Sequence, residues 1–197
     1  MTPEDVLAHK PVVLSQEQRQ LYFDQGFLKI DGLMDDDWLN RLRSLSDDFI
    51  EASRAETESG EAYDLAPDHS AEKPYVRRLR GPEARHPGFW EFASNSIFTD
   101  IAEDLVGPDV KFHHGKLNYK HPGSAEVVKW HQDIPAWPHT NFSPVTLGVY
   151  FHDVTLDEGP LACVPGSHKG EIYSEYHPDR TWSGHLSAED GERAGVS

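Results

Sequence analysis

The spacing of apolar residues changes from one period to another along this chain of 197 residues. Before residue 107, apolar positions recur about every three to four residues, which is the period of a helix. The clearest such stripe consists of Trp38, Leu42, Leu45 and Phe49. From residue 110 onward, apolar and polar residues alternate with the period of about two that is typical of strands. This order predicts an α+β fold, in which helices come first and an antiparallel sheet system follows.

Local signals set the boundaries of these elements. Ser15 and Gln18 form a capping box, which predicts a helix over 16–24 that ends before Gly26. A short strand over 27–30 follows, and the next helix starts after three aspartates at 35–37. Further helical pieces over 89–105 end at Gly107. The strands expected after them cover 112–119, 126–132, 145–151 and 161–164.

Two stretches between the helices differ in charge. Residues 51–73 are acidic and poor in large apolar side chains, and this composition predicts a long surface loop that is mobile or acts as a lid. Residues 74–80 form a basic cluster with Arg77 and Arg78 at its centre. These arginines either balance the neighbouring acids on a solvated face or line a pocket for an anion.

Composition narrows the classes of partner. The formal net charge of −16 argues against nucleic acids and anionic membranes, which would be repelled, and leaves a small molecule as the expected partner. The single cysteine, Cys163, excludes an internal disulfide framework and is typical of a reducing cytoplasm. No apolar run approaches the roughly 20 residues of a membrane span, and the first residues lack the pattern of a secretory leader. We therefore expect a cytoplasmic protein.

The candidate chemistry centres on the sequence Trp130-His131-Gln132-Asp133. On a strand, His131 and Asp133 would share one face. An imidazole and a carboxylate side by side supply two ligands of the 2-His-1-carboxylate triad, which holds non-haem Fe(II) and leaves positions open for substrates. Alone, the pattern also fits a surface histidine followed by an aspartate in a turn.

The wider context resembles the phytanoyl-CoA dioxygenase family of Fe(II)/2-oxoglutarate oxygenases, which includes ectoine hydroxylases. The resemblance spans roughly residues 13–175. It rests on W-H-Q-D, on Asp157-Glu158-Gly159-Pro160-Leu161, on Pro165-Gly166-Ser167-His168-Lys169, and on the segment 20–30 as an opening helix and strand. It implies a single domain over 1–197 with a double-stranded β-helix, the jelly-roll fold of the cupins. Helices over about 1–107 would pack on barrel strands that begin near residue 108.

The resemblance also implies a reaction. His131 and Asp133 would hold Fe(II), and 2-oxoglutarate and O2 would be consumed as a C–H bond of a small organic molecule or thioester is hydroxylated. Lys116, Asn118 and Arg77 are candidates for binding 2-oxoglutarate, with Lys116 equally explained as an exposed strand lysine. Trp137 and His139 are candidates for substrate contacts, although Trp137 is also explained as a core residue. His113 and His114 are candidates for a place beside the metal ligands, with packing or surface exposure as the alternative. His168 is expected to brace its turn.

The chain departs from the family pattern after Asp133. None of the later histidines has the expected setting of the second histidine ligand, and no arginine follows one of them at the expected distance. We expect the final barrel strands, the third ligand and the 2-oxoglutarate arginine to lie beyond Ser197. The alternative is that His177 or His185 completes the site. A metal-free cupin-like binding or structural module, or an inactive fragment of the oxygenase, is the competing functional hypothesis.

Overall fold

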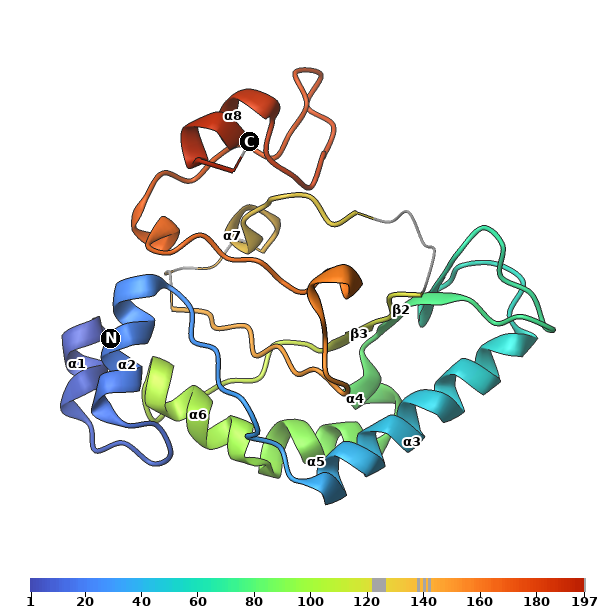
Figure 1. The fold of residues 1–197 in the computed structure, drawn as a ribbon, viewed down its shortest axis with the longest axis horizontal. Helices are drawn as coiled ribbons and strands as arrows, with labels where there is room; N and C mark the ends of the chain where they lie inside the picture. The colour runs from blue at the N-terminus through green and yellow to red at the C-terminus, as the bar shows by residue number, and fades with distance from the viewer. Residues whose placement is uncertain (122–126, 138, 140, 142, 197) are drawn as a thin grey trace.

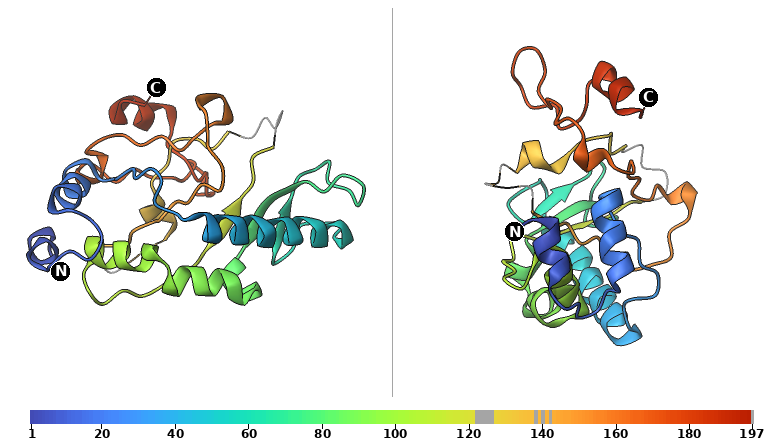
Figure 2. Two further views of the ribbon diagram at one scale, coloured as in Figure 1. Left: turned by 60° about the horizontal axis from the view of Figure 1, so that its bottom comes forward. Right: turned by 90° about the vertical axis from the view of Figure 1, so that its left-hand side faces the viewer.

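The computed structural model describes residues 1–121, 127–137, 139, 141 and 143–196. Helices α3, α5 and α6 lie together on one side of the small sheet, and α8 lies far from them at the opposite end of the view (Figure 1). The other views also place α8 away from these three helices (Figure 2). The segment around residues 145–151 instead reaches the helical layer, since Val145 packs on the cluster that includes Ile101 of α6 and the Phe151 carbonyl accepts the Nε–H of Arg43 on α3.

The eight α-helices of the described residues are mostly short. They are α1 Pro3–Ala8, α2 Gln16–Gln25, α3 Asp36–Ala52, α4 Pro82–Arg85, α5 Pro87–Asn95, α6 Ile97–Val106, α7 Asp133–Ala136 and α8 Ala188–Ala194. The 3-10 turns are η1 Ser53–Ala55, η2 Leu156–Glu158 and η3 Ser167–Lys169. Across the part of the chain that the structure describes, no helix has both the length and the apolar character needed to cross a membrane.

The predicted helix boundaries are confirmed where a cap marks them. The Ser15 hydroxyl accepts the N–H of Gln18, whose side chain accepts the N–H of Ser15, and α2 ends at Gly26 with φ 85°. Asp35 caps α3 in the same way, by accepting the N–H of Trp38. The apolar pattern missed α1 and α8, because neither is long enough to show a stripe; each is marked instead by a capping side chain, Thr2 or Ser187.

The sheet has three antiparallel strands in the order β1–β2–β3. They are β1 Tyr63–Leu65, β2 Val76–Arg80 and β3 Lys116–Asn118. The register shifts between Asp64 and Leu65, and such a bulge lets buried residues on β2 be three positions apart instead of two. The prediction of a surface loop over 51–73 is therefore wrong at residues 63–65, which gain strand structure by pairing with β2 and burying Tyr63 and Leu65.

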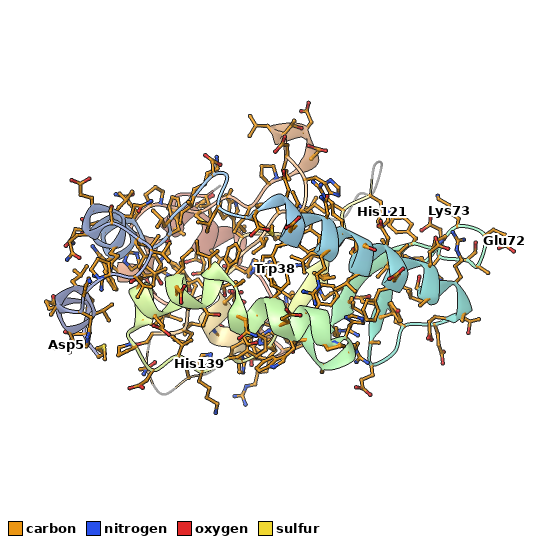
Figure 3. The ribbon with its side chains drawn as sticks, turned by 90° about the horizontal axis from the view of Figure 1, so that it is seen from below. Asp5, Trp38, Glu72, Lys73, His121 and His139 are labelled. Atoms are coloured by element: carbon orange, nitrogen blue, oxygen red, sulfur yellow. The ribbon has the colours of Figure 1, made fainter. Side chains whose placement is uncertain are left out.

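Among the residues that the structure describes, the apolar core forms two clusters. One is formed by the sheet, with Tyr63, Leu65, Val76 and Leu79 buried and with Phe49 of α3 packed against them. Trp38, also on α3, meets Phe92 of α5 edge to face at 5.3 Å and lies between the two helices (Figure 3). The second cluster joins the N-terminal segment to α6 through Leu14, Ile101 and Leu105. The predicted one-sided stripe on α3 thus serves packing.

A buried acid and a buried base fasten α6 to the N-terminal segment. The carboxylate of Asp104, only 2% exposed, accepts the N–H groups of residues 12, 13 and 14 at 2.7–2.8 Å. The guanidinium of Arg19, 1% exposed, donates to the carbonyl oxygens of Asp104 (2.8 Å), His9 (3.0 Å) and Val6. Both charges are satisfied by backbone groups, which is the condition for burying them.

The α+β class is confirmed, but most of the predicted strands are not. Within 112–119 only Lys116–Asn118 is a strand, and residues 27–30, 127–132, 145–151 and 161–164 form none. Residue 126 lies outside the described residues. An alternating pattern makes a strand only when a neighbouring strand supplies hydrogen bonds, and the described ladder consists of β1, β2 and β3 alone. Consistent with this, Leu161 remains 73% exposed instead of entering a core.

Candidate active site

His131 and Asp133 lie face to face, although not on a strand as predicted. The chain is irregular at His131, and Asp133 is the first residue of α7, a turn whose start tolerates Pro135 because the first helical N–H groups have no helical partner. The His131 Nε2 is 3.5 Å from the Asp133 Oδ1. On the far side of the ring, Nδ1 lies 2.8 Å from the carbonyl oxygen of Lys129. A carbonyl only accepts, so Nδ1 carries a proton, and Nε2, which faces Asp133, is the nitrogen that would give up its proton to bind a metal.

Each side chain shifts the protonation of the other. The hydrogen bond with Asp133 is the main cause that raises the pKa of His131, against the opposing effect of desolvation. The same hydrogen bond lowers the pKa of Asp133, with smaller contributions from the charge of Lys116 and from the hydroxyl of Thr146, 3.5 Å from Oδ2. Without a metal, the pair is therefore biased towards an imidazolium–carboxylate ion pair.

The donor set fits two of the three protein ligands of a non-haem iron site. Two atoms 3.5 Å apart can both reach one ion at the roughly 2.0–2.2 Å typical of metal–nitrogen and metal–oxygen bonds. Over the described residues, no group of three or more His, Cys, Asp or Glu side chains is placed to hold a metal. His185 instead lies 2.8 Å through Nδ1 from the carbonyl of Leu186, and its ring is 6.3 Å from that of His177. Neither histidine completes the site.

The three 2-oxoglutarate candidates do not converge on one point. Lys116 is close enough to Asp133 for its charge to lower that pKa. Asn118, two residues further along β3, accepts a hydrogen bond at 2.9 Å from Nε of Arg78, which is its register partner on β2. The Nη1 of Arg77 lies 3.8 Å from the Oδ1 of Asp64 on β1. The structure thus places Lys116 within electrostatic range of Asp133, pairs Asn118 with an arginine, and places Arg77 beside Asp64 of β1.

The substrate candidates form an aromatic cluster one helical turn after Asp133. The N–H of Trp137 donates to the Asp133 carbonyl, and its ring lies 4.6 Å from that of His114 and 5.6 Å from that of His113. His139, labelled in Figure 3, is 5.4 Å from His113 between ring centroids. Desolvation is the main cause that lowers the pKa of His114, and its neighbours His113 and Lys116 add to it.

His168 braces its turn, as the sequence resemblance implies. Its Nε2 lies 3.0 Å from the carbonyl oxygen of Phe23, and the N–H of Gly166 donates to the carbonyl of Gln25 at 2.8 Å. The turn therefore covers the C-terminal end of α2, where carbonyl groups lack helical partners. Gly26 allows this contact, since a Cβ there would lie 2.7 Å from the His168 Cγ.

Glu175 and Gln132 are the residues that sequence reasoning missed. The Glu175 carboxylate is buried, and it accepts the backbone N–H of Gln132, between the two candidate ligands, at 2.5 Å. A surface cavity of about 360 Å³ nearby is lined by Trp130 and α8, but not by His131 or Asp133. A glutamate in a polar stretch 42 positions after Asp133 gives no signal of this contact in the sequence.

Comparison with known proteins identifies the family. The profile described as phytanoyl-CoA dioxygenase (PhyH) matches residues 22–194, which include both candidate ligands and Glu175. The chain belongs to the phytanoyl-CoA dioxygenase family. The resemblance inferred from the W-H-Q-D and P-G-S-H-K motifs is thereby confirmed.

Several curated proteins are similar to this chain. A probable alpha-ketoglutarate-dependent hypophosphite dioxygenase of Stutzerimonas stutzeri is 27% identical over 80% of the chain and 54% of its own length. The L-proline trans-4-hydroxylase of Streptomyces griseoviridis is 29% identical over 78% and 61%. The peroxisomal phytanoyl-CoA dioxygenase of Rattus norvegicus is 28% identical over 87% and 52%. The chain therefore spans little more than half the length of these relatives.

Proposed function

We propose that this chain carries the metal-binding part of an Fe(II)- and 2-oxoglutarate-dependent dioxygenase that hydroxylates a small organic molecule or thioester. The observation that carries the proposal is the geometry of one pair: the Nδ1 of His131 donates to the Lys129 carbonyl, which leaves Nε2 as the metal-binding nitrogen, and Nε2 faces the Asp133 Oδ1 at 3.5 Å. Family membership supports it, as do relatives named for alpha-ketoglutarate-dependent oxidation and for hydroxylation.

The chain's own residues would bind and orient, while the bound group supplies the chemistry. Fe(II) with 2-oxoglutarate and O2 provides an oxidant able to attack a C–H bond, with release of succinate and CO2. His131 and Asp133 would hold the iron. Lys116 would attract a 2-oxoglutarate carboxylate, a role that matters in a chain of net charge −16. Asn118 and Arg77 are also proposed to bind 2-oxoglutarate, for which their side chains would have to leave Arg78 and Asp64, their present partners.

The aromatic cluster is the proposed substrate side of the site. Trp137 and His139 would contact the substrate, with His113 and His114 behind them, because these rings begin one helical turn from Asp133. The named substrates of the relatives are hypophosphite, L-proline and phytanoyl-CoA, which differ in size and charge. A panel of small acids, amino acids and acyl thioesters is therefore the appropriate screen.

We further propose that the segments after residue 127 contribute to a double-stranded β-helix when paired with further strands. The support is their alternating sequence together with exposed apolar side chains, such as Val127, Val128 and Leu161, which a closed barrel would cover. The third iron ligand and the arginine for 2-oxoglutarate are proposed to lie in such strands.

Anaerobic addition of Fe(II) and 2-oxoglutarate tests the proposal. A chelate held by His131 and Asp133 gives a weak visible charge-transfer band, which His131→Ala removes and His152→Ala, at an exposed position, leaves unchanged. Substrate-stimulated succinate release from the metabolite panel then identifies the reaction. A protein with all barrel strands present that shows neither band nor succinate would support the competing hypothesis of a metal-free cupin-like binding module.

A further inference from the structure

Glu175 is a buried acid at the base of a hairpin. Its side chain is 1% exposed, although the residues around it in sequence are mostly exposed. The hairpin covers residues 175–183: Tyr176 and Trp182 form an antiparallel bridge, and the N–H of Ser183 donates to the Glu175 carbonyl at 2.9 Å. Arg180 closes the turn with a positive φ of 68°. The hairpin thus fixes the backbone from which the Glu175 carboxylate projects.

The Glu175 carboxylate and the residues just before the hairpin, 171–173, hold Gln132, which lies between the two candidate ligands. Glu175 Oε1 accepts the N–H of Gln132 at 2.5 Å. The Gln132 side chain donates to the carbonyl of Glu171 at 3.0 Å and accepts the N–H of Tyr173 at 2.9 Å. On the other side of the hairpin, the N–H of Leu186 donates to the Trp130 carbonyl at 2.9 Å. Residues 130 and 132, which flank His131, are therefore both held by the segment 171–186.

The charge of Glu175 has an electrostatic consequence at the pair. Burying a carboxylate is costly, and a neutral N–H offsets only part of that cost. A positive charge nearby offsets more of the free-energy cost of burying the carboxylate. Glu175 Oε1 lies 2.5 Å from the backbone nitrogen of Gln132, the residue between the two candidate ligands. A dication held by His131 and Asp133 would therefore lie in a favourable field from this carboxylate.

We infer that Glu175 is a positioning residue for the metal centre: its carboxylate holds the His131–Asp133 turn, and it couples metal binding at this pair to docking of the hairpin 175–183. The inference rests on the proposed function for the presence of a metal. Coupling of this kind is reciprocal, so a bound metal stabilises the docked hairpin as much as the docked hairpin favours the metal.

Titration with Mn(II), followed by electron paramagnetic resonance, tests the metal half of the inference on the full chain. Glu175→Ala removes both the acceptor and the charge, and we expect Mn(II) affinity to fall about 10-fold or more, as for other partners that support metal ligands. Glu175→Gln keeps an oxygen that can accept the Gln132 N–H, so it should recover part of this loss. Glu171→Gln is the matched control: it removes the same charge from the same segment, where the side chain pairs only with the surface residue Arg193 in the contacts described.

Amide hydrogen exchange tests the coupling. In the wild type, Mn(II) should slow exchange at Gln132 and at the hairpin amides of His177 and Ser183, which donate within or from the hairpin. In Glu175→Ala the Gln132 amide should exchange faster without metal, and Mn(II) should no longer protect the hairpin. Gln132→Ala disrupts the interaction between Gln132 and the segment 171–175 in a second way. It removes the side-chain contacts to Glu171 and Tyr173 but keeps the N–H bound to Glu175.

The outcomes separate this inference from the proposed function. If wild-type protein binds Mn(II) through His131 and Asp133 and Glu175→Ala binds it equally well, the inference is wrong while the proposed function stands. Unchanged hairpin exchange on metal binding contradicts the coupling in the same way. If the wild type binds no metal, the proposed function fails, and the metal role of Glu175 fails with it.

Discussion

The Nε2 of His131 lies 3.5 Å from the Oδ1 of Asp133, and its opposite ring nitrogen is held by the Lys129 carbonyl at 2.8 Å. The two residues are separated by a single residue, Gln132, yet they belong to different local structures. This relationship makes the pair both a metal-ligand candidate and, without metal, an ion pair.

The metal-free pair should titrate at shifted pH values. The pKa of His131 is raised above its ordinary 6.5, so its stabilising contribution is complete below 6.5 and is lost as the pH rises through the higher folded pKa. The pKa of Asp133 is lowered below 3.8, so its contribution is present above 3.8 and is lost as the pH falls through the lower folded pKa. The pair therefore stabilises the fold most between about pH 3.8 and 6.5.

Nuclear magnetic resonance titration of the imidazole protons measures this, with the His131 signal assigned from its absence in His131→Gln. In Asp133→Asn the His131 pKa should return towards 6.5, because the negative partner is gone. A His131 pKa at or below 6.5 in the metal-free wild type would contradict the ion-pair geometry.

In a protein with all barrel strands present, Asp133→Ala should abolish the proposed hydroxylation, because it removes an anionic ligand that nothing at that position replaces. The charge-transfer band with Fe(II) and 2-oxoglutarate should disappear in the same variant. Asp153→Ala, an exposed aspartate in the same half of the chain, serves as control and should keep both properties. Retained hydroxylation at unchanged iron affinity in Asp133→Ala would mean that Asp133 is not a ligand.

Asp104→Ala should destabilise the fold by about 3–5 kcal/mol, because three backbone N–H groups lose a charged acceptor, at least one of them in a buried setting. Chemical denaturation measures the change in the free energy of unfolding. Glu103→Ala, at the neighbouring and partly exposed position of α6, should cost less than about 1 kcal/mol. Similar losses for the two variants would show that the carboxylate of Asp104 does not anchor the N-terminal segment.

Gly26→Ala should destabilise the protein by more than Gly32→Ala does. Both glycines have positive φ, 85° and 66°, so each substitution costs about 1–2 kcal/mol in backbone strain. A Cβ at residue 32 meets nothing within 4 Å, whereas at residue 26 it collides with the His168 ring.

Thermal unfolding measures the cost of this clash. It compares Gly26→Ala, Gly32→Ala, His168→Ala and the double variant Gly26→Ala/His168→Ala. Adding Gly26→Ala to His168→Ala should cost no more than Gly32→Ala does. If Gly26→Ala costs the same with and without the imidazole, the turn at His168 does not pack on the end of α2 in solution.

The sequence alone determined the features that depend on neighbouring residues. Caps at Ser15 and Asp35 set the starts of α2 and α3, because a capping side chain reaches only two or three residues along its own chain. The H-x-D spacing indicated His131 and Asp133 as a pair because the two residues are close in sequence. The order of several motifs identified the family.

Only the tertiary structure decided which alternating segments became strands. A strand needs hydrogen bonds from a partner that can be distant in sequence, so residues 63–65 in an acidic stretch joined the sheet, while the apolar alternation at 145–151 did not. The contact of Glu175 with the Gln132 N–H spans 43 residues and involves a backbone group that every residue except proline carries. No pattern in the sequence could indicate this contact, because only the fold determines which backbone N–H the carboxylate meets.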